Sequence, residues 1–113
     1  MYTEIPAAEA TGRLDLRPGC HVSRIEHRES GKASGVVYFD DQGTEQRQIA
    51  RIVCVAGNAI ETPRLLLLSE SSQFPDGMAN SSGEVGRNYQ RHTSGSVFAT
   101  FDDPVHMYRG ATV

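Results

Sequence analysis

The stretch "RIVCVAGNAIETPRLLLLSES", Arg51–Ser71, decides the fold class. Its apolar run Ile52–Ala56 ends at a Gly-Asn pair, and the chain then continues as Thr62, Pro63 and four leucines. An unbroken apolar strand is typical of a parallel sheet that is covered on both faces. Thr62 can cap a helix and Pro63 suits its first position. The stretch therefore predicts a strand, a tight turn and a helix whose leucines pack onto the sheet, which is the unit of an α/β fold.

The turn between the expected strand and helix is made of small residues. Ala56, Gly57 and Ala59 would let backbone N–H groups and the positive end of the helix dipole approach a phosphate or a flavin edge. Any tight strand-to-helix turn also needs small residues, whether or not it binds a ligand. On the pattern alone, both interpretations stay open.

The residues before this unit predict a short helix and then an antiparallel meander. "AAEA", between a possible cap at Thr3 and a stop at Gly12, favours a helix of one or two turns. Residues 13–17 and 21–27 look extended on either side of a Pro-Gly turn. In a regular strand over 21–27, Val22 and Ile25 would fall on opposite faces.

A hairpin follows over "GVVYFDDQGTEQRQIA". Val36–Phe39 is β-branched and aromatic, and Asp40–Gly43 supplies the turn. Thr44–Ile49 returns with polar residues, so we expect one of its faces to lie in water. After the helix, residues 69–86 predict a long surface loop, and Ser96–Phe101 predicts a further strand.

Composition describes an ordinary globular chain of 113 residues with 38% apolar residues. No apolar run approaches the roughly 20 residues of a membrane-spanning helix, and the start of the chain lacks the pattern of a signal peptide. A net charge of −3 argues against a nucleic-acid partner. The compartment is not indicated. Cys20 and Cys54 are most simply explained as buried packing residues, with a disulfide as the lesser alternative.

The sequence offers no metal or nucleophile motif. His21, His27, His92 and His106 lack the spacing of a metal site, and there is no GxSxG. "NSS" at 80–82 fits a glycosylation sequon, although so short a triplet is common by chance.

Three segments together resemble the glucose-methanol-choline (GMC) oxidoreductases. "VCVAGNAIETPRLLLLS" resembles the family's strand, small-residue turn and leucine-rich helix. "LRPGCHVSRIEH" resembles the preceding strand, and "GMANSSGEVGRNYQRH" resembles a later stretch ending in GRN-x-x-x-H. "FDDPVHMYRG" continues in the manner of a bacterial subgroup with gluconate- and choline-type dehydrogenases. The resemblance covers nearly the whole chain and implies a Rossmann-like FAD-binding domain.

Several residue roles are implied by this resemblance. Val22 would hydrogen-bond the FAD adenine through its main chain, and Ala56 and Gly57 would lie beside the adenosine end of FAD. Asn58 stands where many members have Gly, which puts the geometry of the turn in doubt more than cofactor binding.

The resemblance also implies roles for the later stretch. Arg87, Asn88 and His92 would lie near the flavin, where the chain passes from the FAD domain into the substrate domain. It implies an FAD-domain portion at 1–93 and the start of a substrate domain at 94–113.

The family's GxGxxG and its catalytic His pair are not found in these 113 residues. We therefore expect a middle slice of an FAD-dependent enzyme that oxidises a CH–OH group of an alcohol, sugar or polyol by hydride transfer to flavin. The slice alone would bind FAD weakly at most and would not turn over. The alternative is a non-catalytic β-rich binding module derived from such an enzyme. Either could form homo-oligomers through exposed strand edges.

Overall fold

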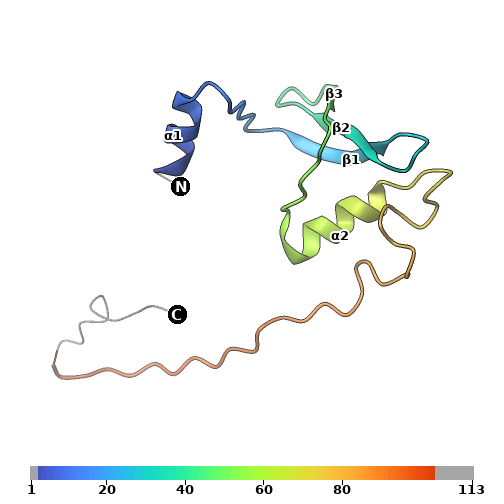
Figure 1. The fold of residues 1–113 in the computed structure, drawn as a ribbon. Coiled ribbons are helices and arrows are strands. Elements are labelled where there is room, and N and C mark those ends of the chain that lie inside the picture. The colour runs from blue at the N-terminus through green and yellow to red at the C-terminus, as the bar shows by residue number, and fades with distance from the viewer. Residues whose placement is uncertain (1–2, 104–113) are drawn as a thin grey trace.

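The computed structural model describes residues 3–103 as two helices and one three-stranded antiparallel sheet (Figure 1). The elements run in the order α1 (Glu4–Ala10), β1 (His21–His27), β2 (Ala33–Phe39), β3 (Glu45–Ile49) and α2 (Asn58–Leu68). The strands lie in the order β1-β2-β3, and α2 packs against β1. After α2 the chain makes a series of turns and then runs away from the sheet as an extended segment (Figure 1).

The predicted hairpin is confirmed as β2 and β3. The Asp40 carboxylate fixes its turn, because Oδ1 accepts the N–H groups of Gln42 at 3.0 Å and Thr44 at 2.8 Å. Gly43 completes the turn with a φ of 74°, which glycine adopts without strain. All five residues of β3 are exposed, so both of its faces lie in water rather than the single face expected.

A register shift in β1 resolves the imperfect alternation of its apolar residues. Val22 pairs with Tyr38 and Ile25 pairs with Val36, with a shift between Val22 and Arg24. Val36 and Tyr38 are two apart on β2 and share a face, so their partners share it too. The expectation that Val22 and Ile25 lie on opposite faces is wrong, because the extra residue of a β-bulge reverses the alternation.

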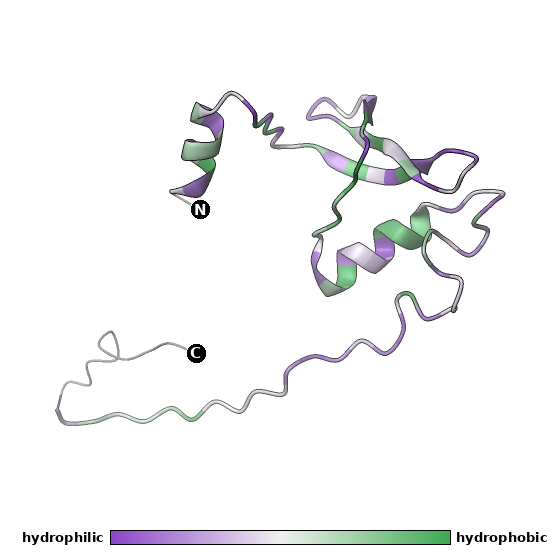
Figure 2. Ribbon diagram, in the orientation of Figure 1, coloured by the Kyte–Doolittle hydropathy of each residue, from purple (hydrophilic) through white to green (hydrophobic). Residues whose placement is uncertain are grey.

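The core of the described residues is small, since Ile25 and Val37 are its buried apolar side chains. Ion pairs cross the strands around Val37, one between Arg24 and Glu45 at 3.6 Å and one between Arg47 and Glu26. Figure 2 shows that hydrophilic and hydrophobic segments are mixed along the sheet. A core of this size leaves much apolar surface in water.

Two predicted strands do not form within residues 3–103. Residues 52–56 and 96–101 are irregular, and Ile52, Val97 and Phe98 are 78%, 95% and 94% exposed. A strand needs a neighbour for its backbone N–H and C=O groups, and the described residues place none beside these segments. The parallel Rossmann-like sheet therefore stays a prediction, while the antiparallel meander and the helix are present.

The predicted start of α2 is also wrong. The helix begins at Asn58, so Thr62 and Pro63 lie inside it rather than at its cap and first position. Asn58 Oδ1 accepts the N–H groups of Ile60 at 2.8 Å and Glu61 at 3.1 Å and thereby caps the helix one turn earlier.

Helix α1 forms where it was predicted. Thr3 stands at its N-cap without a side-chain capping bond, and Gly12, at a φ of 66°, follows its end. No helix within residues 3–103 is long and apolar enough to cross a membrane. Residues 104–113, half of the predicted 94–113 substrate-domain segment, lie outside the described residues.

Candidate functional site

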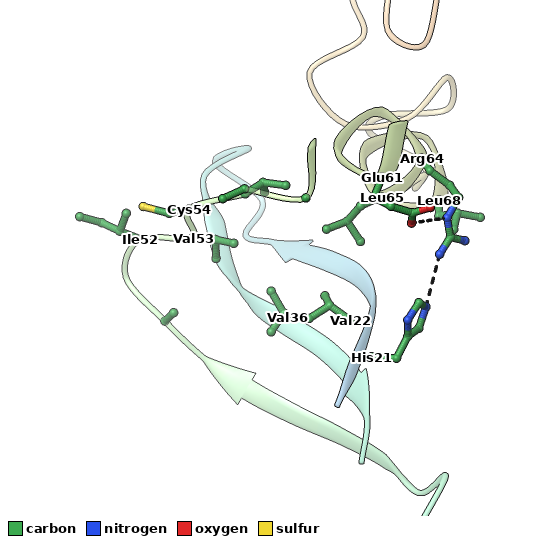
Figure 3. A pocket seen from close by; sticks show the side chains of 14 residues that line it. His21, Val22, Val36, Ile52, Val53, Cys54, Glu61, Arg64, Leu65 and Leu68 are labelled. Atoms are coloured by element: carbon green, nitrogen blue, oxygen red, sulfur yellow. Dashed lines mark hydrogen bonds and ion pairs between the residues drawn. The ribbon is translucent and has the colours of Figure 1, made fainter. Parts of the chain in front are cut away.

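A hollow of about 470 Å³ lies between the sheet, residues 50–57 and helix α2. We call it the apolar hollow. Figure 3 shows Val22 and Val36 rising from the sheet and Leu65 facing them from α2. Residues 52–56 form the remaining wall, and His21, Glu61, Arg64 and Leu68 complete the lining. The hollow can take a flat, largely apolar group of nucleobase size.

Three of the residues singled out by the sequence meet in this hollow. Val22 comes from β1, and Ala56 and Gly57 come from the turn before α2, yet all three line the same space. A Cβ added at Gly57 would lie 3.2 Å from Glu61 Cβ and 3.4 Å from the backbone nitrogen of Thr62. The absence of a side chain at Gly57 therefore allows the turn to lie close against the first turn of α2. That these residues contact FAD stays a prediction.

The start of α2 is not an open cradle for a phosphate. The N–H of Gly57 donates to Thr62 Oγ1 at 3.1 Å. Asn58 occupies the N–H groups of Ile60 and Glu61. Intramolecular oxygens thus already take most of the donors that a phosphate would need. This end of the hollow therefore suits an apolar group better than a phosphate.

Asn58 adopts a φ of 74°, in the left-handed region that favours glycine. Asparagine tolerates this conformation better than most residues, and here its amide also caps α2. An asparagine at this position is therefore compatible with a turn that favours glycine, and it adds a cap to α2. Asn58 itself does not line the apolar hollow.

Arg87, Asn88 and His92 lie away from the apolar hollow. The N–H of Arg87 donates to the carbonyl of Glu84 at 3.1 Å, and Asn88 Nδ2 donates to Glu84 Oε2 at 3.0 Å. This turn lies against α2, since the position of a Cβ on Gly86 is 3.3 Å from Leu67 Cδ1. His92 is exposed in the extended segment that follows. The structure does not bring these three residues to the other predicted contacts.

Sequence reasoning missed a polar edge of the hollow formed by Glu61, Arg64 and His21. Arg64 Nε donates to Glu61 Oε2 at 2.7 Å, and Arg64 Nη2 lies 3.4 Å from His21 Nε2 (Figure 3). The spacing of Glu61 and Arg64 on a helix signals this ion pair. No local pattern signals that His21, from the start of β1, joins them.

A second hollow of about 460 Å³ shares Val22 and Val36 with the first. Arg17 lies on its wall, where it pairs with Asp15 at 2.6 Å and donates to the Tyr38 hydroxyl at 2.8 Å. The hydrogen bond to Asp15, followed by the one to Tyr38, raises the pKa of Arg17 above its ordinary value. Because Asp15 already balances the charge of Arg17, this hollow is no strong anion site.

Other features of the described residues have structural explanations. Asn80 of the NSS triplet donates to the Asp76 carbonyl at 2.7 Å and accepts the N–H of Val85 at 3.0 Å, so its amide holds the loop together. Cys20 and Cys54 are both free thiols, and the expectation that they are buried is wrong, since Cys20 is half-buried and Cys54 is exposed. Residues 3–103 contain no group of metal-ligating side chains, and His106 lies outside them.

Comparison with known proteins places the chain in a family of oxidoreductases. The family described as GMC oxidoreductase matches residues 3–94. A 2-methyl-1,2-propanediol dehydrogenase of Mycolicibacterium austroafricanum is 44% identical over 92 residues, which are 80% of this chain and 16% of that protein. The fructose dehydrogenase large subunit of Gluconobacter japonicus is 34% identical over 94 residues, 81% of this chain and 17% of that protein.

A gluconate 2-dehydrogenase flavoprotein of Pantoea cypripedii is 31% identical over 99 residues, 87% of this chain and 16% of that protein. This chain thus belongs to the GMC oxidoreductase family, as its three motifs indicated. It spans about a sixth of the length of these curated relatives.

Proposed function

We propose that this chain supplies the adenosine side of the FAD site in a longer GMC oxidoreductase. In that enzyme the apolar hollow receives the adenine, with Val22 on one wall and Ala56 and Gly57 on the other. The observation that carries the proposal is that these residues, 34 and 35 positions apart in the sequence, line one hollow in a chain of this family.

The chemistry of the hollow supports an adenine rather than a phosphate. Its walls are aliphatic, and burial of a flat ring against them is favoured by the hydrophobic effect. The backbone donors at the start of α2 are already bonded to Thr62 and Asn58. The pyrophosphate is then held by other parts of the enzyme.

The reaction of the longer enzyme is the oxidation of a CH–OH group in an alcohol, sugar or polyol. The names of the relatives support this class, since they include a propanediol, a fructose and a gluconate dehydrogenase. FAD, when bound, supplies the acceptor for the hydride. The chain's own residues bind and orient the adenine end, and the isolated chain has no turnover.

Arg87, Asn88 and His92 then serve the other end of the cofactor. They follow the α2 region and lead into the extended segment after residue 88. We assign them to positions near the flavin, at the passage from an FAD-domain portion at 1–93 to a substrate domain beginning at 94.

A titration of the purified chain with FAD tests the adenine site. Saturable quenching of flavin fluorescence together with a rise in thermal midpoint is expected for the wild type. Gly57→Val should weaken binding, because a Cβ at this position would lie 3.2 Å from the Cβ of Glu61, another residue that lines the hollow, and would displace it. Gly95→Val is the matched control, since a Cβ there meets nothing within 4 Å. Equal binding by all three proteins would contradict the proposal.

A further inference from the structure

Residues 96–101, Ser-Val-Phe-Ala-Thr-Phe, form an apolar stretch that lies entirely in water. All six residues are exposed, and the side chains of Val97 and Phe98 are almost completely so. No backbone hydrogen bond ties the stretch to another segment among residues 3–103. Figure 1 shows it in the extended part of the chain that runs away from the sheet. Both edges and both faces of this segment are therefore open to another molecule.

The sequence of the segment favours a strand that pairs with copies of itself. Val, Phe and Thr favour strands, and residues 96–101 contain no charge, no proline and no glycine. In an extended chain Val97, Ala99 and Phe101 share one face. A small residue between two large ones lets two such faces interdigitate. The face is thus complementary to the same face of another copy.

Other segments with a strand pattern lack this combination. The edge strand β3 carries Glu45 and Arg47, and charges on an edge strand oppose pairing with another chain. Residues 52–56 are uncharged, but Val53 and Val55 are half-buried and line the apolar hollow beside α2. Copies of residues 52–56 stacked at the strand spacing of about 4.8 Å would force helices about 10 Å wide into one another.

The flanks of residues 96–101 act in opposite directions. Residues 88–95 separate the segment from the turn at Gly86 that contacts α2, which leaves the folded part of the chain clear of a stack. Asp102 and Asp103 follow the segment directly and are exposed. In a stack, the like charges of neighbouring copies lie close together and repel, so these two carboxylates oppose its growth.

We infer that residues 96–101 assemble with the same residues of other copies of this chain into a cross-β stack. Each backbone N–H and C=O group of the segment then pairs with the copy above or below. The face of Val97, Ala99 and Phe101 packs against the same face of a second stack. The partner of this surface is another copy of the chain, and the inference does not depend on the adenine site.

Incubation of the full 113-residue chain at increasing concentration tests this inference. Thioflavin T fluorescence should rise after a lag, and the fibres should diffract at about 4.7 Å and about 10 Å. Val97→Lys should abolish the rise within the time that the wild type needs, because a charge enters every layer of the stack. Tyr89→Lys is the matched control, since it adds the same charge at an exposed residue outside the segment. It should form fibres like the wild type.

A double variant, Asp102→Asn with Asp103→Asn, tests the effect of the two carboxylates. Its lag should be at least about twofold shorter than that of the wild type, because like charges no longer lie side by side in the stack. Glu29→Gln with Glu70→Gln removes two exposed acids elsewhere and should shorten the lag less. Equal lags for the two double variants would contradict the location of the stack beside Asp102.

Hydrogen exchange on the fibres identifies the stacked residues directly. The backbone of residues 96–101 should be the most strongly protected part of the chain. Protection centred on residues 52–56 would overturn the inference. It would also be overturned by equal lags for Val97→Lys and Tyr89→Lys, or by a wild type that forms no cross-β fibres.

Discussion

Ser69 is the residue that joins the sheet to the end of α2. It is 2% exposed, its Oγ accepts the N–H of Ile25 at 2.8 Å, and its hydroxyl donates to the carbonyl of Leu65 at 2.6 Å. It therefore satisfies a backbone group beside one of the core side chains. A buried N–H group without a partner is destabilising, which explains why a small polar residue occupies this position.

Ser69→Ala should lower the free energy of unfolding by about 1–3 kcal/mol, because the N–H of Ile25 loses its acceptor in a buried place. Urea unfolding of the wild type and the variant measures the change. Ser72→Ala is the control, since Ser72 is exposed, and it should leave the midpoint unchanged. A loss of the same size in both variants would show that Ser69 has no special role.

Asp40 gives the hairpin a dependence on acid. Its bonds from the backbone N–H of Thr44 and from Gln46 lower the pKa of this carboxyl below its ordinary value of 3.8. The folded state therefore favours the ionised form. The stabilisation is fully present above the ordinary pKa and is lost as the pH falls through the lowered value.

Thermal midpoints measured between about pH 5 and pH 2 should fall more steeply for the wild type than for Asp40→Asn, which cannot titrate. The amide resonances of Gln42 and Thr44 should move over the same pH range, because their acceptor is protonated there. Identical pH profiles for the two proteins would refute this role of Asp40.

At the scale of elements, α2 depends on the cap at Asn58. Asn58→Ala removes the acceptor of two N–H groups and places alanine at a φ of 74°. We expect a loss of about 1–2 kcal/mol in unfolding free energy and a decrease in helical circular dichroism. Asn58→Gly keeps the backbone conformation and should recover part of the loss. If glycine were no better than alanine, strain at this position would be excluded.

The elements that the sequence predicts well are those with local causes. The β2–β3 hairpin follows from an Asp-Asp-Gln-Gly turn between suitable strands, and α1 is bounded by Thr3 and Gly12. The sequence predicts the start of α2 at the wrong residue, because Thr62-Pro63 is a stronger signal than Asn58. Capping by Asn58 depends on a left-handed backbone conformation.

The elements and contacts with non-local causes were not predictable in the same way. Residues 52–56 carry a strand pattern, but a strand also needs a neighbour, and none lies beside them among residues 3–103. The bulge in β1 and the approach of His21 to Arg64 depend on packing between distant segments. The family motifs in the sequence predicted the wall residues of the candidate site. They did not predict its polar edge.

At the scale of the whole molecule, the chain is more open than a free-standing domain. Its radius of gyration is 20.5 Å, whereas a compact chain of this length has about 13 Å. With only Ile25 and Val37 as buried apolar side chains in residues 3–103, the hydrophobic effect holds little of the chain together. Residues 52–56, of which Ile52, Cys54 and Ala56 are exposed, keep the apolar pattern that predicts a strand.

The isolated chain should therefore self-associate through residues 52–56. Light scattering during size exclusion should give a mass above the 12.3 kDa of the monomer. Ile52→Lys, placed at a 78% exposed position, should reduce association without affecting the small core. The same substitution at exposed Ile60 of α2 is the control. A monomer at all concentrations would contradict this prediction.

Amide NMR shifts on addition of ADP test most directly whether the apolar hollow binds adenine. An adenine site in the apolar hollow predicts saturable shifts at Val22, Ala56 and Gly57, the walls of the hollow, with Arg87, Asn88 and His92 unmoved. Saturable shifts centred instead on the second hollow at Arg17 and Tyr38, or no shifts at all, would contradict it.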